Sequence, residues 1–239
     1  MMKEVCLKSQ RLTKILSGIT EDVFKEENIK RLSEEARRKE KKDNLITDLH
    51  SVDDAYFRKA LKYPLKDFAY PRAALGIGTI STDIDKSSFF HELVAKKLMR
   101  LQNTVGSAQN ALCMLYPDDG YIGWHHNGNA PGYNVLFSYS QDGDGHFKYY
   151  DKEKDEVVYM YDKPGWNVKC GYYPSEVKEP NRVYWHAAST KKARLSIAFV
   201  IHNRDMWVNM VEYITDSDYD KHAIESQGPL KDLKSNGYI

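Results

Sequence analysis

Short runs of alternating apolar and polar residues begin near residue 110, and this pattern restricts the fold more than any other feature. Alternation with a period of two is typical of β-strands that bury one face. We expect strands at residues 110–116, 121–126, 133–140, 146–150, 156–161, 166–173, 182–186 and 193–202. About eight short strands at this spacing indicate an antiparallel sandwich or jelly roll.

Turn-forming residues separate several of these strands, at 118–120, 129–132, 142–145 and 163–165. Glycine, proline, asparagine and aspartate favour turns because they adopt or stabilise turn conformations. The run from Asp142 to Gly145 also has some likeness to a calcium loop. It carries two carboxylates and no downstream glutamate at the EF-hand position, so we interpret it as a hairpin turn.

The N-terminal part of the chain has a helical pattern instead. Thr20, followed by two acidic residues, predicts the start of a charged helix that runs to about residue 44. Residues 51–62 and 85–103 predict two further helices, with Ser87 or Ser88 as the cap of the second. The fold class that follows is α+β, mainly β, with a jelly-roll core and with N-terminal and flanking helices.

We expect three parts along the chain. Residues 1–70 form an N-terminal helical extension, residues 71–205 form the β domain, and residues 206–239 form a closing helix or lid and a polar tail. A chain of 239 residues is long enough to bury a substantial core.

Composition excludes several classes of function. Lys and Arg total 35 against 34 Asp and Glu, so the net charge of +1 does not favour binding to nucleic acid. The basic run at 37–42 could serve as an arm for nucleic acid, but such a run is more often the solvated face of a helix, which is the interpretation we favour. No apolar run is long enough for a transmembrane helix, and we expect no secretion signal because the first residues lack an uninterrupted apolar segment. Three cysteines without CxxC spacing indicate reduced thiols, and we expect a cytoplasmic protein.

Candidate metal ligands stand at two places. His125 and Asn127 are two residues apart, so on a strand they share a face, and His186 lies 61 positions later. Two imidazoles and one oxygen ligand, with other positions open, are typical of non-haem Fe(II) oxygenases. The third ligand of such a site is normally a carboxylate, and here it is an amide.

A longer series of residues surrounds these three. In chain order it comprises Tyr116-Pro117, Gly120, His125-x-Asn127, Tyr139, the 142–145 turn, Gly165-Trp166, His186 and Arg194-x-Ser196. Over residues 110–202 the series resembles the Fe(II)/2-oxoglutarate-dependent dioxygenases, most closely their prolyl-hydroxylase-like branch. Residues 124–134 are also similar to segments of oxygenase-like proteins from phages of marine bacteria, which would place the protein in the host cytoplasm.

The resemblance implies a double-stranded β-helix core with Fe(II) bound by His125, Asn127 and His186. It also implies 2-oxoglutarate as co-substrate and dioxygen as oxidant, with release of succinate and CO₂. Arg194 is the candidate for the far carboxylate of 2-oxoglutarate, because its planar fork suits bidentate carboxylate binding. Ser196 shares its face and adds a hydroxyl.

Four aromatic residues and a third histidine complete the expectation. Tyr116 and Tyr139 stand where family members place a tyrosine that hydrogen-bonds the co-substrate. Trp124 and Trp185 directly precede the two histidine ligands, so we expect them to face the other way and to fill the sandwich core. His126 also points away from the metal if its strand is regular.

The amide at Asn127 has several explanations. It ligates the metal through its oxygen in a natural, weaker site, or it leaves the position to water or halide, or it is an introduced Asp-to-Asn change. A register shift would instead bring Asn129 to the metal. We favour natural ligation by Asn127.

The function implied is that of a hydroxylase acting on a protein or peptide side chain such as prolyl. The alternatives are a nucleobase-oxidising member of the same superfamily and a degenerate, non-catalytic barrel that acts as a binding module. The near-zero net charge argues against the nucleobase alternative. Membrane partners are not expected, and the sequence does not indicate the oligomeric state.

Overall fold

The structure is a computed structural model that describes residues 2–42, 49–62, 88–108, 110–128, 130–183 and 185–216. Its helices are α1 (Gln10–Val23), α2 (Glu26–Lys42), α3 (Asp54–Ala60), α4 (Phe89–Val105) and α5 (Arg204–Thr215), with short 3₁₀ turns η1 (Leu49–Val52) and η3 (Pro180–Arg182). Its strands are β1 (Lys3–Val5), β2 (Asn110–Tyr116), β3 (Tyr121–His125), β4 (Gly132–Ser140), β5 (His146–Asp151), β6 (Glu156–Tyr161), β7 (Gly165–Tyr173), β8 (His186–Ser189) and β9 (Arg194–Ile201).

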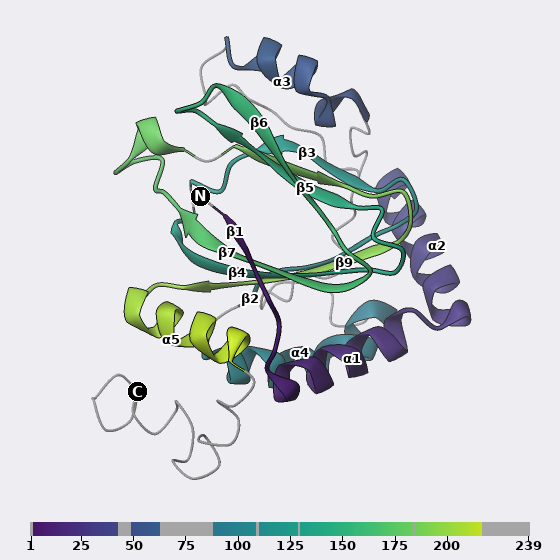
Figure 1. The fold of residues 1–239 in the computed structure, drawn as a ribbon. Helices are drawn as coiled ribbons and strands as arrows, with labels where there is room; N and C mark the ends of the chain where they lie inside the picture. The colour runs from purple at the N-terminus through teal and green to yellow at the C-terminus, as the bar shows by residue number, and fades with distance from the viewer. Residues whose placement is uncertain are drawn as a thin grey trace.

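These strands form two antiparallel sheets. One sheet has the order β1-β7-β4-β9-β2 and the other has the order β3-β8-β5-β6. The two sheets face each other, with α1, α4 and α5 on the outer side of the five-stranded sheet and α3 outside the four-stranded sheet (Figure 1). A mixed helical and antiparallel-sheet fold is therefore confirmed, and this arrangement is compatible with the expected jelly roll.

The largest core lies between the five-stranded sheet and its helices. Alternate residues of β9, namely Leu195, Ile197 and Phe199, face outward and are fully buried against them. Burying an apolar side chain of this size contributes roughly 1.5–3 kcal/mol. Because side chains alternate along a strand, the residues between them turn into the space between the sheets. There β9 carries Arg194 and Ser196, so the same strand builds both the core and the pocket.

A second core covers the outer face of the four-stranded sheet. Phe57 of α3 stacks on Trp124 with ring centroids 4.1 Å apart, and it lies 6.0 Å from the ring of Trp185. Both tryptophans do face away from the histidines, as expected. The expectation that they fill the space between the sheets was wrong, because α3 buries them on the outside. Lys148 of β5 also holds this region, donating to Asp54 at 2.7 Å and to the carbonyl of Val52.

Several predicted boundaries differ from the structure. Thr20 does not cap a helix: it lies inside α1, where its hydroxyl donates to the carbonyl of Ser17 at 2.9 Å. The true cap is Ser9, and the chain breaks between α1 and α2 rather than before one long helix. The strand expected at 182–186 starts at His186 instead, because a 3₁₀ turn precedes it.

Other expectations were closer. The strands predicted at 110–116 and 156–161 coincide with β2 and β6, and Ser88 caps α4 by accepting from the backbone N–H of His91. The sequence did not predict β1, which pairs with β7. The predicted domain boundary near residue 70 and the polar tail after residue 216 lie outside the described residues. None of the described helices combines the length and apolar character needed to cross a membrane.

Candidate functional site

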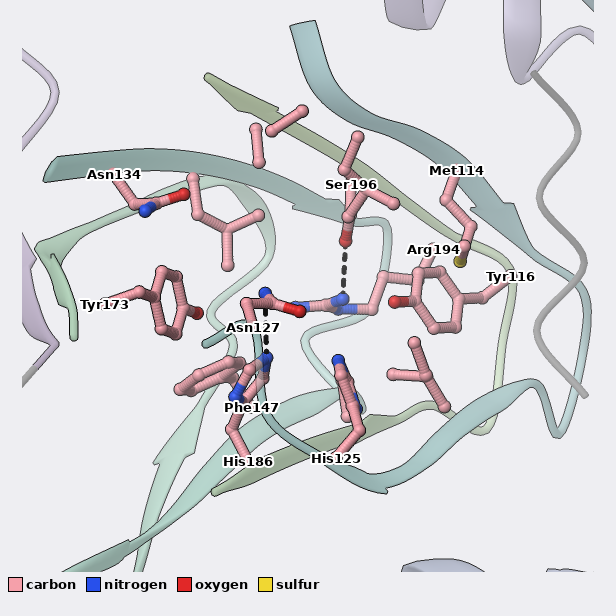
Figure 2. A pocket seen from close by; sticks show the side chains of 16 residues that line it. Met114, Tyr116, His125, Asn127, Asn134, Phe147, Tyr173, His186, Arg194 and Ser196 are labelled. Atoms are coloured by element: carbon pink, nitrogen blue, oxygen red, sulfur yellow. Dashed lines mark hydrogen bonds between the residues drawn. The ribbon is translucent and has the colours of Figure 1, made fainter. Parts of the chain in front are cut away.

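A pocket of about 200 Å³ lies between the two sheets. Both sheets contribute to its wall, and most of the lining side chains belong to alternate positions of their strands (Figure 2). The lining residues are Ala111, Leu112, Met114, Tyr116, Ile122, His125, Asn127, Asn134, Leu136, Phe147, Tyr173, His186, Ala188, Arg194, Ser196 and Ala198. The volume is below the roughly 300–1,000 Å³ of pockets for drug-sized ligands, so it suits small molecules.

The two predicted histidines face each other in this pocket. His125 and His186 are paired across β3 and β8, and their ring centroids are 4.2 Å apart. Both side chains are buried, with 6% and 5% exposure. The Nδ1 atom of His125 lies 2.8 Å from the carbonyl oxygen of Gly123. A carbonyl only accepts, so Nδ1 carries a proton, and in the neutral ring Nε2 is then the nitrogen that can bind a metal.

An irregularity in β3 helps to aim His125. The register of β3 against β8 shifts between Ile122 and His125, so three steps on β3 match two on β8. Such a bulge turns a strand locally and is common beside active sites. Here it brings both Ile122 and His125 to the pocket, although an unbroken alternation would place them on opposite faces. Gly123, inside the bulge, was the one sequence signal for it.

Asn127 follows β3 and reaches the same point. Its Nδ2 lies 3.4 Å from Nε2 of His186, as the dashed line in Figure 2 marks. The structure therefore brings His125, Asn127 and His186 together. Oδ1 and Nδ2 exchange places when the amide rotates by half a turn, so the oxygen can take the position beside the imidazoles. Asn129, the alternative ligand, lies outside the described residues.

His126 points to the opposite side, as expected. Its ring meets the Trp185 ring edge-on at 4.7 Å, and its Nδ1 lies 3.8 Å from a carboxylate oxygen of Glu176. Burial lowers the pKa of His126, and Glu176 partly opposes this effect. His126 therefore contacts the outer core and does not line the pocket.

The three residues suit a first-row metal such as Fe(II) through two nitrogen donors and one neutral oxygen donor. Among the described residues no group of three or more His, Cys, Asp or Glu gathers as a metal site. The set proposed here has two histidines and an amide instead. An amide oxygen leaves the full charge of the metal uncompensated, so this set predicts weaker metal binding than a site with a carboxylate.

Arg194 lies across the pocket from the histidines and belongs to a buried ionic network. Its Nε donates to Asp162 at 2.6 Å, Nη1 donates to Ser196 at 2.6 Å, and Nη2 donates to Ser138 at 2.9 Å. Lys169 donates to the other oxygen of Asp162 at 2.7 Å. Arg194 is thus both a structural ion-pair residue and a pocket residue, and these two interpretations do not exclude each other.

Tyr116 and Ser196 lie beside Arg194. The guanidinium of Arg194 is 5.4 Å from the centre of the Tyr116 ring. Burial raises the pKa of the Tyr116 phenol, although Arg194 and Ser196 favour its ionised form. The phenol therefore stays neutral and able to donate a hydrogen bond at neutral pH. This end of the pocket presents one guanidinium and two hydroxyls, a set suited to a carboxylate.

Tyr139 does not belong to the site. Its ring centroid lies 4.8 Å from that of Phe24 and 5.4 Å from that of Trp166, on the helix-covered side of the sheet. Its neighbours in the chain, Ser138 and Ser140, occupy the inward positions of β4. The expectation that Tyr139 binds the co-substrate was therefore wrong. Side chains alternate along a strand, and Tyr139 stands at a position of β4 that faces the helices.

Sequence reasoning missed other residues around the pocket. Asn134 and Tyr173 line its other end. Asp162 and Ser138 accept hydrogen bonds from Arg194, and Lys169 donates to Asp162. The inward parity of the predicted strands at 133–140 and 166–173 was a signal for Asn134 and Tyr173. Asp162 had no such signal, because it follows a strand and its partners are distant in sequence.

The titration of the half-buried His146 and the buried Asp162 predicts acid lability. Burial, followed by Lys148 and Arg194, lowers the pKa of His146 to about 4. Burial opposes the ionisation of Asp162, yet Arg194 and Lys169 outweigh it and hold its pKa at about 2. Both folded-state pKa values lie below those of an unfolded chain. Asp162 therefore contributes stability that is lost as the pH falls from about 4 to 2. His146 destabilises the folded state as the pH falls from about 6.5 to 4, because the unfolded chain takes up a proton that the folded chain does not.

We expect the urea concentration at the unfolding midpoint to decrease as the pH is lowered from about 6.5 to 4, because His146 becomes protonated in the unfolded chain. It decreases further as the pH is lowered toward 2, because Asp162 becomes protonated. The check is a series of urea unfolding curves across this range for the wild type and for His146→Gln. The variant is expected to show a shallower slope between pH 6.5 and 4. An identical slope would contradict the assignment to His146.

Comparison with known proteins gives distant likenesses. No protein-family model matches the chain, and no curated protein sequence matches it. A Pseudomonas putida prolyl-4-hydroxylase structure gives a TM-score of 0.35 at 10% identity, covering 84% of this chain and 92% of that one. YcfD, a ribosomal oxygenase from Escherichia coli, gives 0.31 at 17% identity, covering 59% and 34%.

Drosophila melanogaster CENP-C bound to CAL1 gives a TM-score of 0.26 at 8% identity, covering 36% of this chain. The match spans little more than half of that structure, 57% of its length. TM-scores this low carry no weight for function. The function is therefore inferred from the residues of the pocket.

Proposed function

We propose that the protein is a non-haem Fe(II)- and 2-oxoglutarate-dependent oxygenase with a double-stranded β-helix core. One observation carries the proposal: His125, Asn127 and His186 meet in a buried pocket whose opposite wall presents Arg194. A dicarboxylate that chelates a metal requires metal ligands and a carboxylate-binding cation in the same small pocket. Neither set alone would distinguish this function from an ordinary metal or anion site.

Each residue then has a role. His125, Asn127 and His186 would hold the metal, and the Gly123 carbonyl fixes the tautomer of His125 for this purpose. Bound Fe(II) supplies the activation of dioxygen that is coupled to conversion of 2-oxoglutarate to succinate and CO₂. Arg194, with Ser196 and Tyr116, would bind the far carboxylate. Because these groups are buried, water competes weakly for them.

The other end of the pocket supports an uncharged substrate group. Ser138 and Asn134 are four residues apart on β4, so the Arg194 end and the Asn134 end are separated by roughly 13 Å. The residues at the Asn134 end are Asn134, Leu136, Phe147, Tyr173 and Ala198, and none of them is charged. A charged side chain would lose its hydration there without a partner. The proposed substrate is therefore a neutral protein side chain, such as prolyl.

The test is succinate production. The protein is incubated in air with Fe(II), ascorbate and 2-oxoglutarate, with and without a mixture of proline-containing peptides. We expect slow succinate release that the correct substrate accelerates, and none above background in His125→Ala. Fully folded protein that releases no succinate under any condition would contradict the proposal and favour a barrel that binds without oxidising.

A further inference from the structure

Three charged side chains are buried together next to the pocket. The side chains of Asp162, Lys169 and Arg194 are 0%, 1% and 1% exposed. Asp162 lies between the two cations, with one carboxylate oxygen on each. Of the three, Arg194 alone is among the residues that line the pocket. Asp162 and Lys169 therefore act on any ligand there through Arg194.

The group carries an unbalanced charge. Asp162 is ionised at neutral pH, because the two cations hold its pKa at about 2. Two cations and one carboxylate leave a surplus of one positive charge, which reaches the pocket at Arg194. Burying an uncompensated charge is unfavourable, so an anion at this position is stabilised. One carboxylate would balance the group.

The hydrogen bonds also fix the direction of the guanidinium. An arginine has five N–H donors in a rigid fork. Asp162, Ser196 and Ser138 each accept from one of them. Two donors are left over from these bonds, one on Nη1 and one on Nη2. A pair of donors on the two terminal nitrogens matches the geometry of bidentate carboxylate binding.

Close packing prevents this arrangement from shifting. A Cβ added at Gly145 would come within 2.8 Å of Oδ2 of Asp162 and 3.1 Å of Cδ of Arg194. The backbone N–H of Asp162 also donates to the carbonyl of Gly145 at 2.9 Å. The turn before β5 therefore presses directly on the pair. This explains why the 142–145 turn ends in glycine.

We propose that Asp162, held by Lys169, is a positioning residue that aims Arg194 at the far carboxylate of the co-substrate and so selects dicarboxylates. This inference rests on the proposed function for the identity of the ligand. The competing explanation is that Asp162 merely neutralises Lys169 inside the fold. The two explanations differ in what happens when Asp162 and Lys169 are removed together.

The experiment compares two 2-oxo acids that differ in the far carboxylate, 2-oxoglutarate and 2-oxopentanoate. Their dissociation constants are measured by calorimetry on metal-free protein, so the readout does not depend on iron or on turnover. Wild-type protein is expected to prefer 2-oxoglutarate by about tenfold or more, as for a charge-assisted bidentate contact. A wild type without this preference would overturn the inference, even if the metal site is later confirmed.

The decisive variants are Asp162→Asn and the double variant Asp162→Asn/Lys169→Met. The single variant leaves two buried cations without a carboxylate, so we expect a clearly lower urea midpoint. The double variant keeps the surplus of one positive charge, and its midpoint is expected to recover. Its preference for 2-oxoglutarate is nevertheless expected to fall several-fold, because the positive charge remains but no carboxylate holds the Arg194 guanidinium in the bidentate orientation. A folded double variant that keeps the wild-type preference would show that Asp162 only neutralises Lys169.

A milder pair of variants covers the case in which the charge variants fail to fold. Ser138 accepts from Arg194, whereas Ser140, two residues along and equally buried, accepts from the backbone N–H of Gly143. Ser138→Ala is expected to reduce the preference for 2-oxoglutarate several-fold, and Ser140→Ala is expected to leave it unchanged. Equal preferences in the two variants would contradict a fixed guanidinium. A protein that binds Fe(II) but does not prefer 2-oxoglutarate would refute this inference alone. A protein that prefers 2-oxoglutarate but binds no Fe(II) would refute the oxygenase proposal alone.

Discussion

Replacing His186 with alanine is expected to abolish Fe(II) uptake. His186 supplies one of two nitrogen donors in a set whose third member is a weak amide ligand. Changes to residues that merely support a ligand cost roughly 10–100-fold in metal affinity, so loss of the ligand itself should cost more than about 100-fold. The measurement is anaerobic calorimetric titration of the metal-free protein with Fe(II).

His126→Ala is the matched control for this variant. His126 is next to His125 in the chain, but its ring lies against Trp185 on the other side of the strand. We expect its Fe(II) affinity to equal that of the wild type. Thermal unfolding of both variants shows whether His186→Ala is folded. A folded His186→Ala that binds Fe(II) like His126→Ala would place the metal elsewhere.

Replacing Asn127 with aspartate is expected to tighten Fe(II) binding by about tenfold or more. A carboxylate adds a unit of negative charge beside a divalent cation, and its attraction is worth several kcal/mol at an effective dielectric constant of about 20. Part of this gain is offset by the desolvation of the buried carboxylate, so we take roughly 1.4 kcal/mol as the net minimum. The same anaerobic titration measures it.

Asn127→Ala separates the explanations for the amide. If Asn127 ligates through its oxygen, alanine weakens Fe(II) binding relative to the wild type. If the position is left to water or halide, the alanine variant binds Fe(II) as tightly as the wild type. An aspartate variant with equal or weaker affinity would contradict the view that this amide is a metal ligand.

The strands could be predicted because one face of most of them is apolar along its whole length. Along β9, every second residue is apolar and packs beneath the helices, so alternation appears directly in the sequence. Helix boundaries were less accurate, since they depend on tertiary contacts. Thr20 looks like a cap but is buried in the middle of α1, and the sequence around β1 is too short to show a period.

The centre of the pocket could also be predicted. His125, Asn127, His186 and Arg194 have the right residue types at spacings that a sandwich brings together, and the structure places them around one pocket. The prediction for Tyr139 was wrong because it considered the type of residue and not the face of the strand on which it stands. The apolar residues at the odd positions of β4 already indicated that this face is covered by helices.

The surroundings of the pocket could not be predicted. Asp162 lies 32 residues before Arg194 and follows β6 in a turn, where an aspartate is an ordinary turn residue. Asp162 forms ion pairs with Lys169 and Arg194 because the packing of the two sheets places β7 and β9 next to the end of β6. The bulge in β3 likewise depends on pairing with β8, and Gly123 alone does not specify that pairing.

The central claim is that one pocket holds both Fe(II) and 2-oxoglutarate. Anaerobic titration of the metal-free protein with both, following the weak visible charge-transfer band of the chelate, tests it most directly. If the pocket binds both, the wild type shows a band only after both additions, and His186→Ala shows none. The contradicting result is no band at any metal concentration, in the wild type and in Asn127→Asp alike.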